Sequence, residues 1–158
     1  MCDFDFIEMK IPAKAEYVAV VRLNIAGIAN RMKFDYDAIE DLKVAISEAT
    51  SNVVTHAYEN EGPGEITLGF GIYKDKLEIM VSDRGDSFSF NDIKNNIGPI
   101  DNTHNKRHDQ IREGGFGLFL INALMDKVEI NNNYGVTIYM TKYLDKVGVR
   151  NNDEVSTT

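Results

Sequence analysis

The stretch SEATSNVVTHAY, residues 47–58, decides the fold that this sequence predicts. Within it, Glu48, Asn52 and His56 recur at every fourth position. Apolar residues recur here and just upstream at the spacing of one helical face, namely Ile39, Leu42, Ile46, Ala49, Val53 and Ala57. The pattern predicts an amphipathic helix that carries an apolar stripe and a separate polar face.

The polar face of this helix could carry chemistry. Glu48, Asn52 and His56 lie one turn apart in succession, on a face offset from the apolar stripe by roughly a quarter turn. Mg²⁺ prefers hard oxygen ligands such as the Asn52 carbonyl oxygen, and Glu48 could accept a proton from a nucleophile near that metal. A solvated polar face has the same spacing and is commoner, so the spacing alone leaves both interpretations open.

The rest of the chain mixes helix and strand patterns without a regular strand–helix–strand repeat. The helix through residues 47–58 is expected to begin at a capping box formed by Asp37 and Glu40 and to end near Tyr58. Pro12 is expected to end the first strand. Apolar periodicity predicts strands at 4–11, 66–72, 77–81, 128–130 and 136–141, a hairpin turn at 74–76, and helices at 13–32 and 118–126. This mixture is typical of an α+β two-layer sandwich, a mostly antiparallel sheet packed by helices.

The length of 158 residues indicates one domain, which we assign to residues 1–147. A chain of this size can bury a sizeable core without disulfides or metals. Residues 148–158 are polar and are expected to form a disordered tail. Residues 83–113 are poor in aliphatic side chains, and a loop of that length inside a compact domain predicts a mobile functional segment.

Charge and cysteine content exclude several classes of protein. A net charge of −8 repels nucleic acid and anionic lipid at long range, so we expect neither as a direct partner. Cys2 is the single cysteine, which suits a reducing cytoplasm and excludes a cysteine-cluster metal site within one chain. The start of the chain is acidic, and Arg22 and Asn24 interrupt its most apolar stretch. Neither a secretion signal nor a membrane span is therefore expected.

An acidic turn follows the predicted strand 77–81. Asp83 at the end of a buried strand could accept a hydrogen bond from an exocyclic amine such as adenine N6. Gly85 removes a side chain where a flat base would need room. Taken alone, an ordinary acidic turn is the commoner interpretation.

A glycine-rich run leads into the predicted helix 118–126. Gly114, Gly115 and Gly117 precede Leu118, and glycine lets the backbone approach phosphates at the anion-attracting start of a helix. No Lys-Ser or Lys-Thr follows, so the run is not a Walker motif. A flexible hinge would again be the commoner interpretation of the run by itself.

In this order along the chain, the three motifs resemble the GHKL ATP-binding fold shared by gyrase and the histidine kinases. The resemblance covers about residues 8–143. It implies that Asn52 ligates Mg²⁺ and that Asp83 holds adenine. It also implies that the loop between Asp83 and the glycine run forms a lid over the triphosphate. Thr137 looks like the family's last-strand threonine, which supports adenine binding. Further implied ATP contacts are Gly85, Gly114, Gly115, Gly117 and Leu118.

Within that fold, residues 47–58 are similar to the corresponding helix of bacterial anti-sigma factors that are also serine-protein kinases. Residues 7–13, IEMKIPA, and 140–144, MTKYL, are similar as well. The pattern most resembles members that regulate sigma-B, the general stress sigma factor of Gram-positive bacteria. The resemblance implies a homodimer that holds the sigma factor inactive and uses Mg-ATP to phosphorylate a serine of a small anti-anti-sigma protein, with Glu48 as general base.

Some assignments stay open at this point. Arg107 and Arg112 lie in the expected lid and either could meet the γ-phosphate, although solvated cations of a loop are the commoner interpretation. A structural role is preferred for His56. The alternative functions are a GHKL ATPase that hydrolyses ATP, and a nucleotide-gated sigma-binding module without kinase activity. The sequence indicates neither the surface that binds sigma nor the dimer interface.

Overall fold

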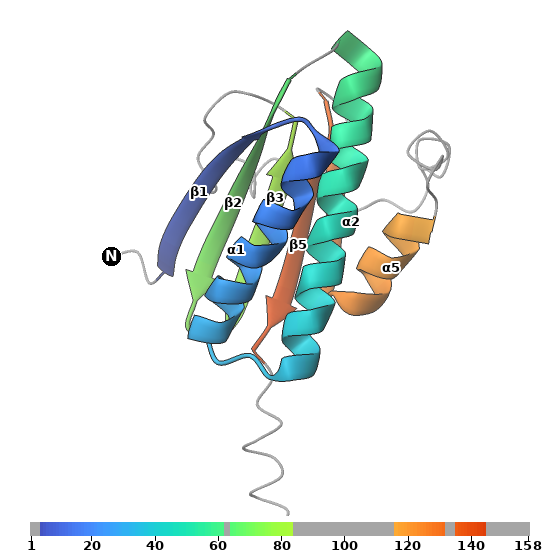
Figure 1. The fold of residues 1–158 in the computed structure, drawn as a ribbon. Coiled ribbons are helices and arrows are strands. Elements are labelled where there is room, and N and C mark those ends of the chain that lie inside the picture. The colour runs from blue at the N-terminus through green and yellow to red at the C-terminus, as the bar shows by residue number, and fades with distance from the viewer. Residues whose placement is uncertain (1–3, 62–63, 84–115, 132–134, 145–158) are drawn as a thin grey trace, which may run out of the picture.

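A five-stranded antiparallel sheet and a layer of helices make up the described part of the protein (Figure 1). The structure is a computed structural model that describes residues 4–61, 64–83, 116–131 and 135–144. The strands lie in the order β1-β2-β3-β5-β4. The elements are β1 (Phe4–Pro12), a short 3-10 helix (Ala15–Tyr17), α1 (Val18–Arg31), α2 (Tyr36–Glu61), β2 (Glu65–Tyr73), β3 (Lys76–Ser82), α5 (Phe116–Leu124), β4 (Lys127–Asn131) and β5 (Thr137–Tyr143).

The core lies between one face of the sheet and the helices. Residues directly opposite in antiparallel strands share a face, so the pairs Phe70–Ile79 and Ile79–Met140 point to the same side. These three side chains are fully buried together with Ile46 and Val53 of α2. The predicted apolar stripe of α2 is therefore the face that packs on the sheet, which confirms the α+β two-layer sandwich.

Two helix starts differ from the sequence prediction. The helix expected from residue 13 begins as an α-helix only at Val18, because Lys14 is extended, with φ −132° and ψ 137°, and a 3-10 turn follows it. For α2, the capping box predicted at Asp37 and Glu40 is wrong. Asp35 caps the helix instead, and its Oδ1 accepts from the Ala38 backbone N–H at 2.8 Å.

The strands follow the predicted alternation, with small shifts at their ends. β1 includes Pro12, which pairs with Glu65 as the last residue of the strand. Proline is tolerated there because β1 is an edge strand and this is its terminus. Only Lys74 and Asp75 separate β2 from β3. These shifts leave the inward-facing residues unchanged, because the alternation fixes them.

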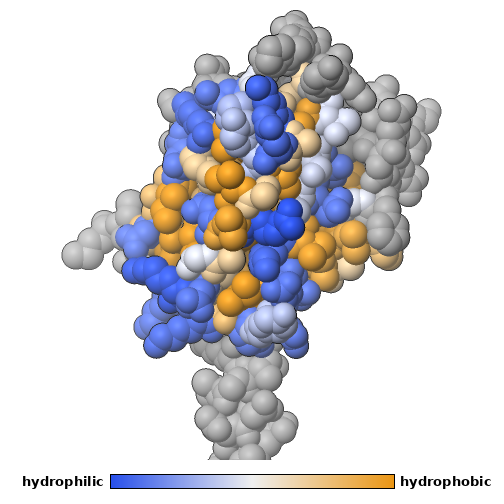
Figure 2. All heavy atoms as spheres, viewed as in Figure 1, coloured by the Kyte–Doolittle hydropathy of each residue, from blue (hydrophilic) through white to orange (hydrophobic). Residues whose placement is uncertain are grey.

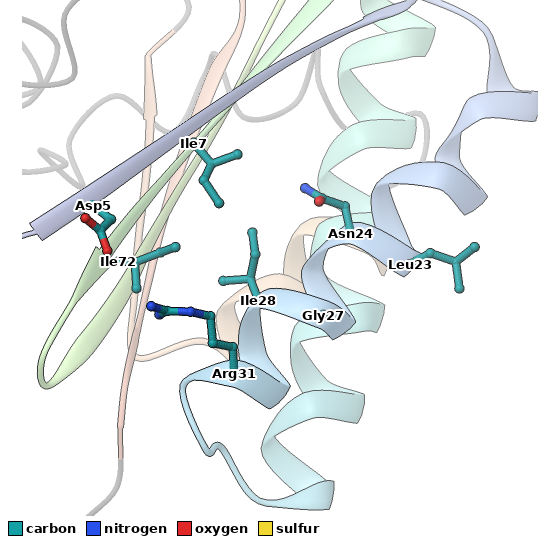
Figure 3. A pocket seen from close by; sticks show the side chains of 8 residues that line it. All are labelled: Asp5, Ile7, Leu23, Asn24, Gly27, Ile28, Arg31 and Ile72. Carbon is teal, nitrogen blue, oxygen red and sulfur yellow. The ribbon is translucent and has the colours of Figure 1, made fainter.

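Apolar surface remains on the outside of the helical layer (Figure 2). Leu23 of α1 is 74% exposed, and Val20, Val44 and Phe119 are also exposed. A cavity of about 520 Å³ lies between α1 and the β1–β2 edge and is lined by Asp5, Leu23, Asn24, Gly27 and Arg31 among others (Figure 3). In the described part of the chain, no helix combines the length and the apolar character needed to cross a bilayer.

Candidate active site

The polar face of α2 borders the site. Glu48, Asn52 and His56 are each partly buried, while Ala49 and Val53 beside them are fully buried. A helix that packs on the core with one face and meets α5 and the end of β3 along its flank holds polar side chains at that seam. The predicted offset between the polar face and the apolar stripe is therefore observed.

Gly117 of α5 lies directly against this polar face. A Cβ atom built on Gly117 would lie 2.9 Å from Glu48 Oε2 and 3.3 Å from Asn52 Nδ2. Both distances are shorter than ordinary van der Waals contact with carbon. The absent side chain thus lets α5 approach α2 while Glu48 and Asn52 keep their positions between the two helices.

Asn52 has an unused polar group at this point. Among the described residues, its buried Nδ2 atom has no hydrogen-bond partner. Amide nitrogen and oxygen are assigned from hydrogen bonds alone, so either end of this amide could meet a ligand. A buried amide without a partner next to Glu48 and Gly117 fits a site that a polar ligand completes.

Asp83 lies beyond the end of β3, where two segments hold its carboxylate. Its Oδ1 accepts from the Val136 backbone N–H at 2.9 Å, and its Oδ2 lies 2.9 Å from His56 Nδ1 on α2. The Asp83 N–H in turn donates to the Val136 carbonyl at 3.2 Å. These contacts fix the Asp83 carboxylate, which connects the end of the sheet to the polar face of α2.

Comparison with known proteins decides the family. Residues 11–142 match the family described as "Histidine kinase-like ATPase domain". Serine-protein kinase RsbW of Oceanobacillus iheyensis is 56% identical over 160 residues, covering 100% of this chain and 99% of that protein. Serine-protein kinase RsbW of Bacillus cereus is 57% identical over 148 residues, covering 94% of this chain and 91% of that protein. The chain belongs to the RsbW family of serine-protein kinases.

The RsbW fold also occurs in a solved structure. The crystal structure of the RsbU and RsbW domains of Rv1364c from Mycobacterium tuberculosis matches with a TM-score of 0.61 at 20% identity. The match covers 89% of this chain and 32% of that longer chain. It supports the fold alone, whereas the ATP-dependent kinase class follows from the RsbW relatives and the ATPase family.

The structure also places two further residues that the sequence assigned to the site of this RsbW chain, Thr137 and Leu118. Thr137 pairs with Ser82 in the sheet, and its hydroxyl lies 2.9 Å from Ser82 Oγ, on the face opposite the helices. The backbone of Val136, rather than the Thr137 side chain, contacts Asp83. Leu118 of α5 is buried and belongs to the core cluster.

Other assignments fall outside the described residues. These are Gly85, Gly114, Gly115 and both lid cations, Arg107 and Arg112. The structure therefore brings together Glu48, Asn52 and Gly117 on one side and His56 and Asp83 on the other, with α2 common to both.

The donor set fits a magnesium ion better than a metal bound by protein ligands alone. The described segments contain no group of three His, Cys, Asp or Glu side chains that could hold a metal. One amide and one carboxylate face the seam between α2 and α5. Mg²⁺ is commonly bound through one or two protein oxygens together with substrate phosphates and water, and the amide oxygen of Asn52 could be such a ligand.

Sequence reasoning missed two contributions to the site. The Val136 N–H became visible only with the pairing of β3 and β5, which places it opposite the end of β3. The contact between His56 and Asp83 joins residues 27 positions apart, and no local pattern signals it. A histidine on the polar face, two turns after Glu48, was the only available signal.

Proposed function

We propose that this RsbW-family kinase binds a sigma factor of the sigma-B type and holds it inactive. In the same proposal, it phosphorylates a serine of a small anti-anti-sigma protein with Mg-ATP. The observation that carries the proposal is the seam where Glu48 and Asn52 meet Gly117. It sets a potential base and a potential magnesium ligand side by side, in a chain that matches RsbW kinases along its whole length.

The proposed chemistry assigns one task to each side chain. Glu48 takes the proton from the serine hydroxyl as the serine oxygen bonds to the γ-phosphorus and the bond to the β–γ bridging oxygen breaks, which releases ADP. Asn52 would hold Mg²⁺, which neutralises phosphate charge when bound. Asp83 would accept from the adenine amine, with Gly85 leaving room for the base.

The glycines have two separate tasks in this proposal. Gly114 and Gly115 would let the backbone approach the phosphates ahead of α5. Gly117 has a Cβ position already crowded by Glu48 and Asn52, which supports a role in the approach of the two helices. Thr137 would contribute by ordering the end of β3 through Ser82, and Leu118 by packing beneath the phosphates.

We infer a homodimer in the cytoplasm, where a sigma factor acts. The sheet face opposite the helices carries aromatic side chains that a second copy could cover. Phe4 stacks on Tyr73 with ring centroids 4.7 Å apart, and Phe6 and Tyr143 are 38% and 39% exposed. Sedimentation at equilibrium should return the mass of two chains.

The test combines labelled ATP, a purified anti-anti-sigma protein and the sigma factor. Label on an antagonist serine supports the kinase. Release of free phosphate without labelled protein would instead indicate an ATPase, and sigma binding without either product would indicate a non-enzymatic module.

Glu48→Gln gives the matched control for this assay. The amide keeps the size of the side chain but cannot take a proton. Because general-base catalysis contributes about 10²–10⁴-fold, serine phosphorylation should fall by that order. ATP binding and sigma capture should persist, and unchanged phosphorylation would remove Glu48 from the mechanism.

A further inference from the structure

We propose that His56 is a positioning residue that orients the Asp83 carboxylate toward the nucleotide base. The inference rests on the proposed function, because it takes Asp83 as the acceptor for the adenine amine. His56 touches Asp83, which makes it a residue that acts through another rather than on the ligand.

The direction of the hydrogen bond follows from the two groups. An ionised carboxylate has acceptor atoms only, so His56 Nδ1 must carry the proton across the 2.9 Å contact with Asp83 Oδ2. The donor is the same whether the imidazole is neutral or charged. In the neutral ring, the contact fixes the tautomer with the proton on Nδ1.

The two anchors of Asp83 come from different layers of the fold. Val136 holds Oδ1 from the sheet, and His56 holds Oδ2 from α2. A carboxylate offers about four acceptor positions, so two remain for a ligand. With both oxygens anchored, these two positions point in fixed directions. With the hydrogen bond from Val136 alone, the Asp83 carboxylate could rotate about Oδ1, and its free acceptor positions would no longer point toward the base.

The Asp83 carboxylate is shielded from solvent, so its orientation depends on its protein partners. The Asp83 side chain is 11% exposed and the His56 side chain 32% exposed, so little solvent competes at the carboxylate. Among the described residues, His56 is the one histidine, lysine or arginine side chain that pairs with Asp83. Removing it would leave Oδ2 of a largely buried carboxylate without this donor, and the carboxylate would then lose its fixed orientation.

The test measures selectivity for the adenine amine. ATP and purine riboside 5′-triphosphate differ only in the 6-amino group, and their dissociation constants are compared by calorimetry in Mg²⁺. The wild type should prefer ATP. His56→Leu should weaken ATP binding about tenfold while leaving the analogue nearly unchanged, since a hydrogen bond to a charged group contributes on this scale. The ratio of the two constants should therefore collapse.

His56→Asn is the rescue variant, because its side-chain nitrogen lies where Nδ1 does and can donate to Asp83. It should restore most of the ratio. Should H56L fail to fold, His56→Gln replaces it, since its amide is displaced by one bond and should not restore the ratio. Melting curves without nucleotide verify folding of every variant.

Three results would overturn the inference. A wild type that does not distinguish the two nucleotides would remove Asp83 as the amine acceptor, and with it both the assignment and the role of His56. A wild type that discriminates, beside an H56L variant with the same ratio, would remove only His56. Equal weakening of both nucleotides in H56L, not rescued by H56N, would show a general structural role instead.

Discussion

Gly117 is the residue on which the geometry of the proposed site depends most closely. A methyl group at this position would lie 2.9 Å from a carboxylate oxygen of Glu48, which is closer than Cβ atoms come to other atoms in proteins. The neighbour that must give way is the far end of a flexible side chain rather than backbone. The displacement should therefore affect the chemistry more than the fold.

We expect Gly117→Ala to lower the rate of serine phosphorylation without lowering the melting temperature. Alanine favours a helix over glycine by about 0.5–1 kcal/mol, which offsets the cost of moving Glu48. Phosphorylation assays and melting curves on the same preparation measure both effects.

Gly27→Ala in α1 is the matched control, because a Cβ there would meet nothing within 4 Å. It should gain stability and keep full activity. Full activity in G117A as well would show that Glu48 tolerates the displacement and that its observed position is not required.

At the scale of residues, the sequence predicted which site side chains share a helix face. It did not predict which backbone groups would contact them. Helical spacing alone predicted that Glu48, Asn52 and His56 share a face, because three or four residues make one turn. The contact of Asp83 with Val136 depends on the register of two strands more than fifty residues apart. Alternation fixes the partner of a residue only once the register is known, so the pairing of Thr137 with Ser82 could not be predicted from the sequence.

At the scale of elements, α2 carries most of the site, and its first turn can be tested directly. Asp35 accepts a hydrogen bond from the Ala38 N–H, one of the backbone donors that a helix start leaves without an internal partner. We expect Asp35→Ala to lower the free energy of unfolding by about 1 kcal/mol, measured by chemical denaturation.

Asp37→Ala is the comparison variant. Asp37 lies in the first turn of α2, but Asp35 rather than Asp37 accepts the capping hydrogen bond from the Ala38 N–H. It should lose only the smaller interaction with the helix dipole, about 0.3–1 kcal/mol. A larger loss for D37A than for D35A would restore the capping box that the sequence suggested.

The buried Tyr139 of β5 should make the stability of the protein depend on pH. Burial raises the pKa of Tyr139 far above its ordinary value, and the charge of the neighbouring Glu78 raises it further. The folded state thus holds the hydroxyl proton more tightly than the unfolded chain. The corresponding stability is present below about pH 10, the ordinary tyrosine pKa, and is lost as the pH rises above it.

Chemical denaturation between about pH 8 and 11 should show this loss in the wild type and a shallower one in Tyr139→Phe. Tyr36→Phe is the control, because Tyr36 is 76% exposed and should leave the profile unchanged. Identical alkaline slopes in all three proteins would contradict the assignment to Tyr139.

Boundaries of elements were harder to predict than their existence. Apolar periodicity runs through α2 and the strands, since each buries one face against the same core. The segment before α1 shows similar apolar spacing, yet Lys14 is extended and no side chain caps the start of α1. Periodicity reports burial, not the hydrogen bonds that begin a helix.

At the scale of the whole molecule, the residues that build the proposed site come from two layers. Glu48, Asn52 and Gly117 belong to α2 and α5, whereas Asp83 follows the last residue of β3 and Val136 precedes the first residue of β5. His56 is the described side chain that bridges the layers at this site. A nucleotide held by both layers would stabilise their packing, so that its binding should appear in global unfolding.

We expect saturating Mg-ATP to stabilise the native protein. A ligand at about 100 times its dissociation constant that binds only the folded state contributes roughly 2.7 kcal/mol. For a chain of this size, that corresponds to a rise in melting temperature of about 5–10 °C.

Asp83→Asn should lose most of this rise, because an amide presents its own donors where the adenine amine must donate. Glu48→Gln should keep the rise, since the adenine and phosphate contacts remain. A wild-type melting curve unchanged by saturating Mg-ATP would contradict the nucleotide site itself, whereas an equal rise in D83N would contradict only the role of Asp83.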